Sequence, residues 1–176
     1  MRRNVCILFG LLFAVWANAE LNESSLVLQG QQGLGVGKHI VFVSGDEEYR
    51  SEESLPMLAR ILAARHGFKC TVLFAISKQT GEIDPNTVDN IPGLQALATA
   101  DLMVICTRFR ELPDEQMRFV DAYLESGKPV IGIRPAVVAF RNRKESAYFE
   151  YSSDYKGADY PNGFGQQVLG STWISH

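Results

Sequence analysis

Short apolar runs alternate along this chain with segments of helical periodicity, and this alternation limits the folds open to it. The apolar runs cover residues 39–44, 68–76, 101–107 and 129–133. Each run is predominantly apolar along both alternating positions, which is typical of a strand buried on both faces. Because sequential strands of this kind are joined by helices, they pair in parallel.

Two segments between the apolar runs carry clear helix signals. Residues 51–66 repeat leucine and isoleucine at helical spacing, with Gly67 just past the end. Ser51 or Ser54 is the expected cap, and a cap at Ser54 places Pro56 in the first turn. Residues 113–126 repeat apolar side chains in the same way, and residues 93–99 suit a shorter helix. We therefore predict an α/β fold with three layers, in which helices cover both faces of a flavodoxin-like parallel sheet.

The first 19 residues have the features of a secretory signal peptide. A basic start at Arg2 and Arg3 precedes an apolar run at 5–16, and small residues at 17 and 19 suit cleavage before Glu20. The apolar run is shorter than the roughly 20 residues that a resident membrane helix needs. We expect an exported protein, periplasmic or extracellular, with no membrane contact after the signal is removed.

Residues 20–37 are rich in glycine, glutamine and serine and show no periodicity, so we predict a flexible linker. The glycines at 33–37 superficially match a phosphate-binding loop. They precede a strand, however, whereas the glycines of such a loop follow one. The folded domain is therefore expected to span residues 38–176.

Composition and spacing argue against several classes of site. The formal charge of −3, with no basic stripe, argues against a nucleic-acid partner. The spacing of His39 and His66 forms no metal-binding motif, so no metal site is predicted and the cofactor stays unknown. Cys70 and Cys106 are expected to be buried thiols. Cys106 lacks the glycine-flanked elbow of an amidotransferase nucleophile, so Cys-dependent amidotransfer is disfavoured.

Ligands of open α/β sheets bind at the carboxyl ends of the strands, and the loop after the first strand is acidic there. It contains Asp46, Glu47, Glu48, Tyr49 and Arg50. Neighbouring carboxylates raise the pKa of one of them, which suits a general acid or base, or they bind a hard cation. The alternative is that the glutamates are solvated and that Asp46 stabilises the start of the next helix.

Arginines occupy the other two loops at this edge. Arg108 and Arg110 flank Phe109 after the third strand, and Arg134 follows the fourth. Arginine forks bind carboxylates or hold sugar hydroxyls. Alternatively they form ion pairs with the acidic loop, which we expect for one of the first two and also for Arg134. The tail adds aromatic side chains that suit a sugar ring or pin a loop to the sheet: Tyr148, Phe149, Tyr151, Tyr155, Tyr160, Phe164 and Trp173.

Three stretches together resemble the ThuA-like (trehalose utilisation) family, and in particular its exported planctomycete-type members. They are KHIVFVSGDEEYRSEE at 38–53, TRFR at 107–110 and GKPVIGIR at 127–134. The resemblance extends over about residues 38–176. It implies a fold similar to class I glutamine amidotransferases and a link to carbohydrate metabolism.

The chain departs from that family in two places. Relatives carry Thr-His-Ala-Phe after the fourth strand, whereas this chain has Val137-Val138-Ala139-Phe140, so Val138 replaces the histidine. Relatives also continue beyond residues 173–176. We therefore expect this chain to be truncated and its sheet to be incomplete at the C-terminus.

Two functions are open. In the first, the protein binds or processes a trehalose-type or modified sugar at the carboxyl edge of the sheet, with Glu48 as general acid or base. Its second catalytic residue is then His176, which matches a family histidine. In the second, motivated by Val138, it is a non-catalytic carbohydrate-binding or degenerate relative. The expected partner is a small carbohydrate, the oligomeric state stays open, and the expected substrate-binding residues are Asp46, Glu47, Tyr49, Arg50, Arg108, Arg110 and Arg134.

Overall fold

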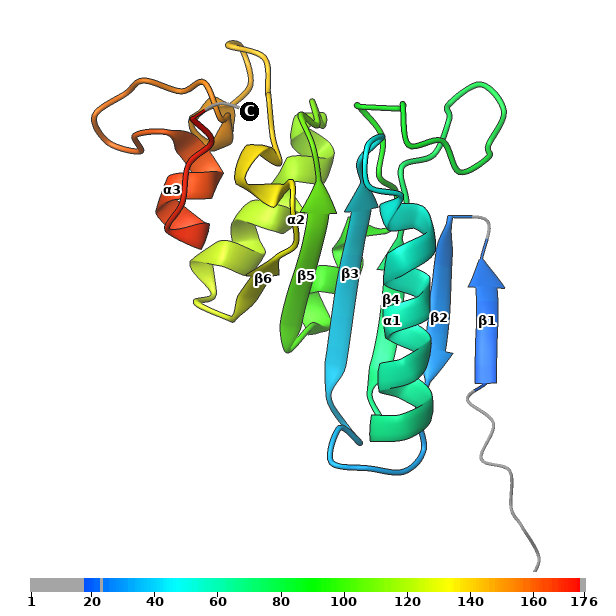
Figure 1. Ribbon diagram of the computed structural model, residues 1–176. Helices are drawn as coiled ribbons and strands as arrows, with labels where there is room; N and C mark the ends of the chain where they lie inside the picture. Colours follow the sequence, from blue (N-terminus) through cyan, green and yellow to red (C-terminus); the bar gives the residue numbers. More distant parts are fainter. Residues whose placement is uncertain (1–17, 23, 175–176) are drawn as a thin grey trace, which may run out of the picture.

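The computed structural model describes residues 18–22 and 24–174, which form an α/β architecture around one sheet (Figure 1). The strand order is β1-β2-β4-β3-β5-β6. The last four strands in the chain run parallel, and the first two pair antiparallel at the β4 edge. The strands are β1 (Asn18–Asn22), β2 (Ser25–Gln29), β3 (His39–Gly45), β4 (Lys69–Leu73), β5 (Leu102–Thr107) and β6 (Val130–Gly132).

The four parallel strands lie within or nearly within the four apolar runs, so these strand predictions are confirmed. Central strand β3 is buried along its whole length, as expected for a strand with helices on both faces. Its side chains alternate between the faces. Ile40 and Phe42 belong to one apolar core, and Val41 and Val43 belong to the other.

Helices cover both faces of the sheet, as predicted. Helix α1 (Ser51–His66) packs over β3 and β4 on one face, and α2 (Asp114–Glu125) lies on the opposite face beside the 3₁₀ helix η1 (Leu94–Thr99) (Figure 1). Gly67 caps the C-terminus of helix α1, and its φ of 83° is the left-handed conformation that glycine adopts at low cost. The helix predictions for these three segments are confirmed.

The N-terminal segment differs from the prediction. Residues 20–37 are not a flexible linker throughout, because β1 and β2 pair with each other and β2 extends the sheet beside β4. The physical reason is burial: Leu26 and Leu28 add to the core under α1. Residues 1–17 of the expected signal peptide lie outside the described residues, and positions 18 and 19 belong to β1.

After β6 the chain packs against β5 and β6 and adds no further strand among the residues described. It forms the 3₁₀ helices η2 (Ala136–Val138) and η3 (Phe149–Tyr151) and then α3 (Gly163–Leu169). Most aromatic residues of this tail pack against one another rather than lining a site. The rings of Phe140 and Phe164, for example, meet edge to face with centroids 5.3 Å apart.

Candidate functional site

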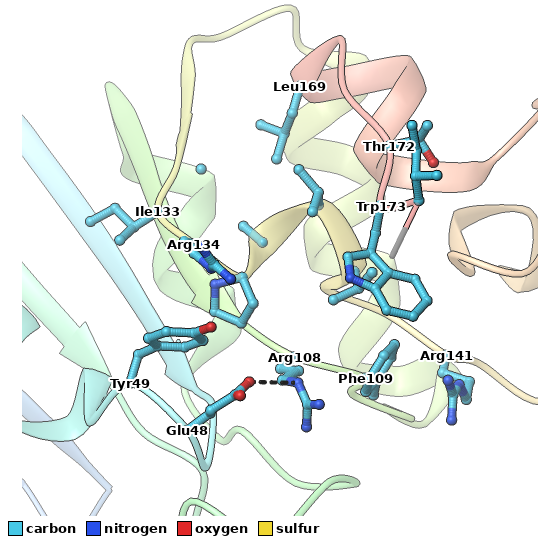
Figure 2. Close-up of a pocket in the computed structure, with 16 residues that line it drawn as sticks. Glu48, Tyr49, Arg108, Phe109, Ile133, Arg134, Arg141, Leu169, Thr172 and Trp173 are labelled. Carbon is cyan, nitrogen blue, oxygen red and sulfur yellow. Dashed lines mark ion pairs between the residues drawn. The ribbon is translucent and has the colours of Figure 1, made fainter. Parts of the chain in front are cut away.

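A cleft of about 800 Å³ opens at the carboxyl ends of the parallel strands (Figure 2). Its walls come from the β3–α1 loop, the β5–α2 loop, the segment from β6 through η2, and residues 169–174 at the end of α3. Parallel strands direct these loops to one edge of the sheet, so segments distant in sequence meet there.

Four of the expected site residues line this cleft: Glu48, Tyr49, Arg108 and Arg134. The Glu48 carboxylate forms an ion pair with Arg108, with Oε2 3.2 Å from Nε. We predicted that Arg134 pairs with a carboxylate, and this prediction is wrong. The guanidinium of Arg134 lies over the ring of Tyr49 instead. The distance from Cζ to the ring centroid is 5.4 Å, and the residue is exposed.

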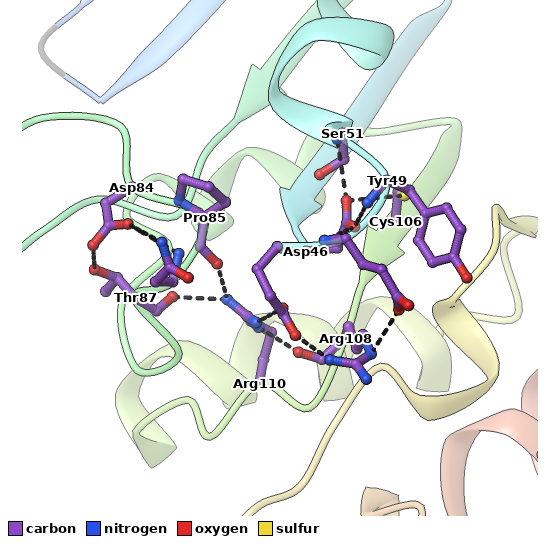
Figure 3. Close-up of polar contacts among 12 residues, drawn as sticks. Asp46, Tyr49, Ser51, Asp84, Pro85, Thr87, Cys106, Arg108 and Arg110 are labelled. Atoms are coloured by element: carbon purple, nitrogen blue, oxygen red, sulfur yellow. Dashed lines mark hydrogen bonds and ion pairs between the residues drawn. The ribbon is translucent and has the colours of Figure 1, made fainter.

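Asp46 does not line the cleft, because its buried carboxylate holds the β3–α1 loop in shape (Figure 3). Oδ1 accepts the backbone N–H groups of Glu48 and Tyr49, and Oδ2 accepts that of Ser51 at 3.1 Å. Burial by itself raises the pKa of Asp46, but a side-chain hydrogen bond with Ser51 and the backbone N–H groups outweigh it. The pKa is lowered overall, so Asp46 is ionised at neutral pH and supports the start of α1.

Glu47 and Arg110 form an ion pair, and neither residue lines the cleft (Figure 3). The buried Arg110 donates to Glu47 Oε2 at 2.8 Å, to the carbonyls of Pro85 and Thr87 at 2.9 Å and to that of Arg108 at 2.7 Å. Burial lowers the pKa of the Arg110 guanidinium, and Glu47 opposes that shift. Glu47 also pairs with Arg108, so both arginines pair with the acidic loop, whereas we expected only one to do so.

The two remaining predicted residues are not part of the cleft as described. Arg50 precedes α1 in the left-handed conformation, with a φ of 56°, and its exposed side chain pairs with Glu53. It lies outside the residues that line the cleft. His176 lies outside the described residues.

Three of the other lining side chains are aromatic or charged: Phe109, Arg141 and Trp173. The Phe109 ring lies between two guanidinium groups, with Cζ of Arg108 4.8 Å and Cζ of Arg141 4.0 Å from its centroid. Trp173 is one of the tail aromatics, but nothing in its local sequence separates it from the others. Arg141 belongs to the basic stretch after Phe140, and a β-bridge between Arg110 and Phe140 brings that stretch to the site.

Cys106 is buried near the cleft, and its environment makes the thiol unreactive. Its Sγ donates to the Arg134 carbonyl at 3.4 Å and lies 3.8 Å from Asp46 Oδ2. Burial and the nearby Asp46 charge raise the pKa of the thiol to about 12. The thiol is therefore protonated at neutral pH, and a protonated thiol is a poor nucleophile. Cys106 and Cys70 are both free and buried, as predicted.

Comparison with protein-family models, with curated proteins and with solved structures finds no match to this chain. Within the described residues, no three His, Cys, Asp or Glu side chains cluster closely enough to hold a metal ion. The same part of the chain contains no helix of the length and apolar character needed to cross a bilayer. The chemistry of the cleft is therefore the basis for a functional assignment.

Proposed function

We propose that this chain is an exported protein of the ThuA-like type that binds and processes a trehalose-type or modified sugar in the cleft at the carboxyl edge of the sheet. The parallel strands have the order β4-β3-β5-β6. This order supports a flavodoxin-like, class I glutamine amidotransferase-like sheet, since such sheets run 2-1-3-4 in chain order. The loops after β3 and β5, on either side of the point where the strand order reverses, both reach the cleft.

The observation that carries the proposal is the combination of aromatic faces with polar forks in one cleft. Tyr49, Phe109 and Trp173 supply rings, and Arg108 and Arg134 supply hydrogen-bond donors. A sugar ring is apolar on one face and carries hydroxyls at its edge, so it needs both kinds of contact. An apolar ligand would leave the Arg134 guanidinium without a hydrogen-bond acceptor.

Glu48 is the residue that we propose for proton transfer. It is the single carboxylate among the described residues that line the cleft, and its side chain is 42% exposed. Arg108 fixes the orientation of this carboxylate through the 3.2 Å ion pair. In this role Glu48 takes a proton from a sugar hydroxyl or from water, or returns one to a leaving oxygen.

A paired measurement of binding and turnover on wild type and Glu48→Gln tests this role. Trehalose, related disaccharides and modified sugars are the ligands. We expect turnover by the wild type and its loss in Glu48→Gln, with binding retained because glutamine keeps the size and an oxygen acceptor. Glu82→Gln, which changes an exposed glutamate outside the cleft, is the matched control and should behave as wild type. Failure of every sugar to bind the wild type would contradict the proposal.

A second candidate is a non-catalytic carbohydrate-binding protein, and Val138 favours it. Val138 is buried and lines the cleft at the position where the resembled family carries a histidine. A valine cannot transfer a proton or bind a metal ion, so the cleft lacks one polar group that an active relative would have. Sugar binding by wild type and Glu48→Gln alike, with no product from any sugar, would decide for this candidate.

A further inference from the structure

We infer that the sugar recognised in this cleft is acidic, carrying a carboxylate, sulfate or phosphate group on its ring. This inference rests on the proposed function and narrows its substrate class. It follows from an excess of positive charge in the cleft and from the way aromatic rings hold that charge in place.

The cleft contains more cationic than anionic groups. Arg108, Arg134 and Arg141 line it, and Glu48 is the single acidic side chain among the described lining residues. Glu48 and the nearby Glu47 both form ion pairs with Arg108, so the positive charge of Arg108 is compensated. Among residues 24–174, the ion pairs involve neither Arg134 nor Arg141. Two uncompensated positive charges therefore face one cleft, in a chain whose formal charge is −3.

Aromatic rings position both of these guanidinium groups. Arg134 lies over Tyr49 with Cζ 5.4 Å from the ring centroid, and Arg141 lies over Phe109 at 4.0 Å. A guanidinium over a ring uses its flat face, so its in-plane N–H groups stay available to bind an oxyanion with two hydrogen bonds. This arrangement limits side-chain freedom before the ligand arrives, which lowers the entropic cost of binding.

The rings also indicate what kind of molecule carries the anion. Figure 2 shows Trp173 between Arg134 and Arg141, with Tyr49 on the Arg134 side and Phe109 near Arg141. A sugar ring against Trp173 would place a ring substituent within the region of either guanidinium. A cleft of about 800 Å³ is also much larger than a bare inorganic anion needs.

Charge strength decides between an acidic and a neutral sugar. A guanidinium donates charge-assisted hydrogen bonds to a hydroxyl as well, but an oxyanion adds the attraction between two opposite charges and accepts two parallel hydrogen bonds. A neutral sugar would displace water from Arg134 and Arg141 and would replace it with hydroxyl acceptors only. We therefore expect an acidic sugar to bind at least about tenfold more tightly than its neutral counterpart at low ionic strength.

Calorimetric titration of the full chain tests the inference. The ligands are a glucuronate-containing disaccharide, a sulfated and a phosphorylated disaccharide, the neutral parent disaccharide, and inorganic sulfate and phosphate. At least one acidic sugar should bind about tenfold more tightly than the neutral parent, and the preference should shrink at high salt because added ions screen exposed charges. The three acidic sugars also show which oxyanion the cleft prefers.

Variants locate the preference within the molecule. Arg134→Gln and Arg141→Gln should each lower the affinity for the acidic sugar more than the affinity for the neutral one, so that most of the preference is lost. Arg60→Gln removes the same charge from an exposed position on α1 outside the cleft and should bind as wild type. Far-UV circular dichroism should be unchanged in all three variants, because each replaced side chain is exposed.

The outcomes separate this inference from the function on which it rests. Equal binding of acidic and neutral sugars would overturn the inference and leave the proposed function intact. A preference that survives in both cleft variants, or inorganic anions that bind as tightly as the acidic sugars, would also overturn it. Failure of every sugar to bind would overturn both.

Discussion

Asp46 and Glu48 are two residues apart and differ completely in environment. Asp46 is buried and accepts backbone N–H groups of its own loop, whereas the Glu48 side chain is 42% exposed and reaches the cleft. A buried carboxylate that accepts several N–H groups is a structural element, because it compensates donors that the turn would otherwise leave unpaired. Of the two, only Glu48 is placed to meet a ligand.

Replacing Asp46 should therefore cost stability. Asp46→Asn keeps the shape of the side chain but replaces one accepting oxygen with an NH₂ group that faces backbone donors. We expect a loss of about 1–3 kcal/mol in the free energy of unfolding. Urea unfolding monitored by circular dichroism measures it, and Asp154→Asn, at an exposed position, is the control. A cost at Asp46 no larger than at Asp154 would contradict the structural role.

His39 should make the stability depend on pH. Its ring is buried, with Nδ1 3.1 Å from Thr99 Oγ1 and Nε2 2.9 Å from Thr71 Oγ1. Burial first and the charge of Lys69 second lower its pKa below 6.5, against the opposing effects of a hydrogen bond with the Thr99 backbone and of the Asp101 charge. Below pH 6.5 the unfolded chain then binds this proton more readily than the folded chain, so the free energy of unfolding falls as the pH falls.

Chemical denaturation at several pH values checks this expectation. The wild type should lose stability as the pH is lowered from about 7.5 to 5.5, which brackets the ordinary pKa of histidine. His39→Gln cannot take up this proton, so its stability should change less over the same range. Equal pH dependence in the two proteins would show that His39 is not the cause.

For Arg108 and Arg110 of the β5–α2 loop, the position at the sheet edge could be predicted from the sequence, but their different roles could not. Both lie at the predicted edge of the sheet, and both pair with the acidic loop, where we expected an ion pair from only one of them. Their roles differ because Phe109 between them adopts a φ of 50° and interrupts the regular backbone. Arg108 then lines the cleft, whereas Arg110 is buried. Nothing in the sequence TRFR distinguishes these two positions.

At the scale of elements, Arg110 anchors the loop that contains Pro85 and Thr87. Its guanidinium donates to both carbonyls while pairing with Glu47. Arg110→Gln removes buried hydrogen-bond donors from the carbonyls of Pro85 and Thr87, so we expect a loss of about 1–3 kcal/mol in the free energy of unfolding. Amide hydrogen exchange should also become faster across residues 84–90.

Arg118→Gln, an exposed substitution on α2, is the control for this experiment and should change neither quantity. Unchanged exchange in residues 84–90 of Arg110→Gln would contradict the anchoring role. Loss of sugar binding without loss of stability would instead mean that Arg110 contacts the ligand directly.

Strand β2 gives a second prediction at this scale. Leu28 is 2% exposed in the core under α1, whereas Leu34, six positions further on, is fully exposed. Leu28→Ala should lower the free energy of unfolding by about 2–5 kcal/mol because it leaves a cavity in the core. Leu34→Ala should change it by less than about 0.5 kcal/mol. Equal effects of the two substitutions would show that the segment is a linker after all.

The parallel strands and the two long helices could be predicted because each has its own local signal. The pattern of apolar runs and the caps at Pro113 and Gly67 are examples. Strand β2 could not be predicted in the same way, because its partner β4 lies about 40 residues away and its apolar stretch at 26–28 is short. The paths of the tail residues Arg141 and Trp173 depend likewise on tertiary packing.

For the whole molecule, we propose that loops from distant parts of the chain form one sugar-binding cleft at the carboxyl edge of the sheet. Glu48 and Tyr49 after β3, Arg108 after β5, Arg134 after β6 and Trp173 of the tail all line it. The rule for ligand position in open α/β sheets predicted the loops after β3, β5 and β6. It could not indicate the contribution of the tail, which follows the last strand described.

The fluorescence of Trp173 tests whether a sugar binds in this cleft. The chain contains two tryptophans, so Trp16→Phe in the full chain leaves Trp173 as the single indole fluorophore. Titration of this variant with acidic and neutral sugars should give a saturable change in Trp173 emission, with an affinity that matches calorimetry. Sugar binding that leaves the emission of Trp173 unchanged would contradict the proposal, as would the absence of any binding.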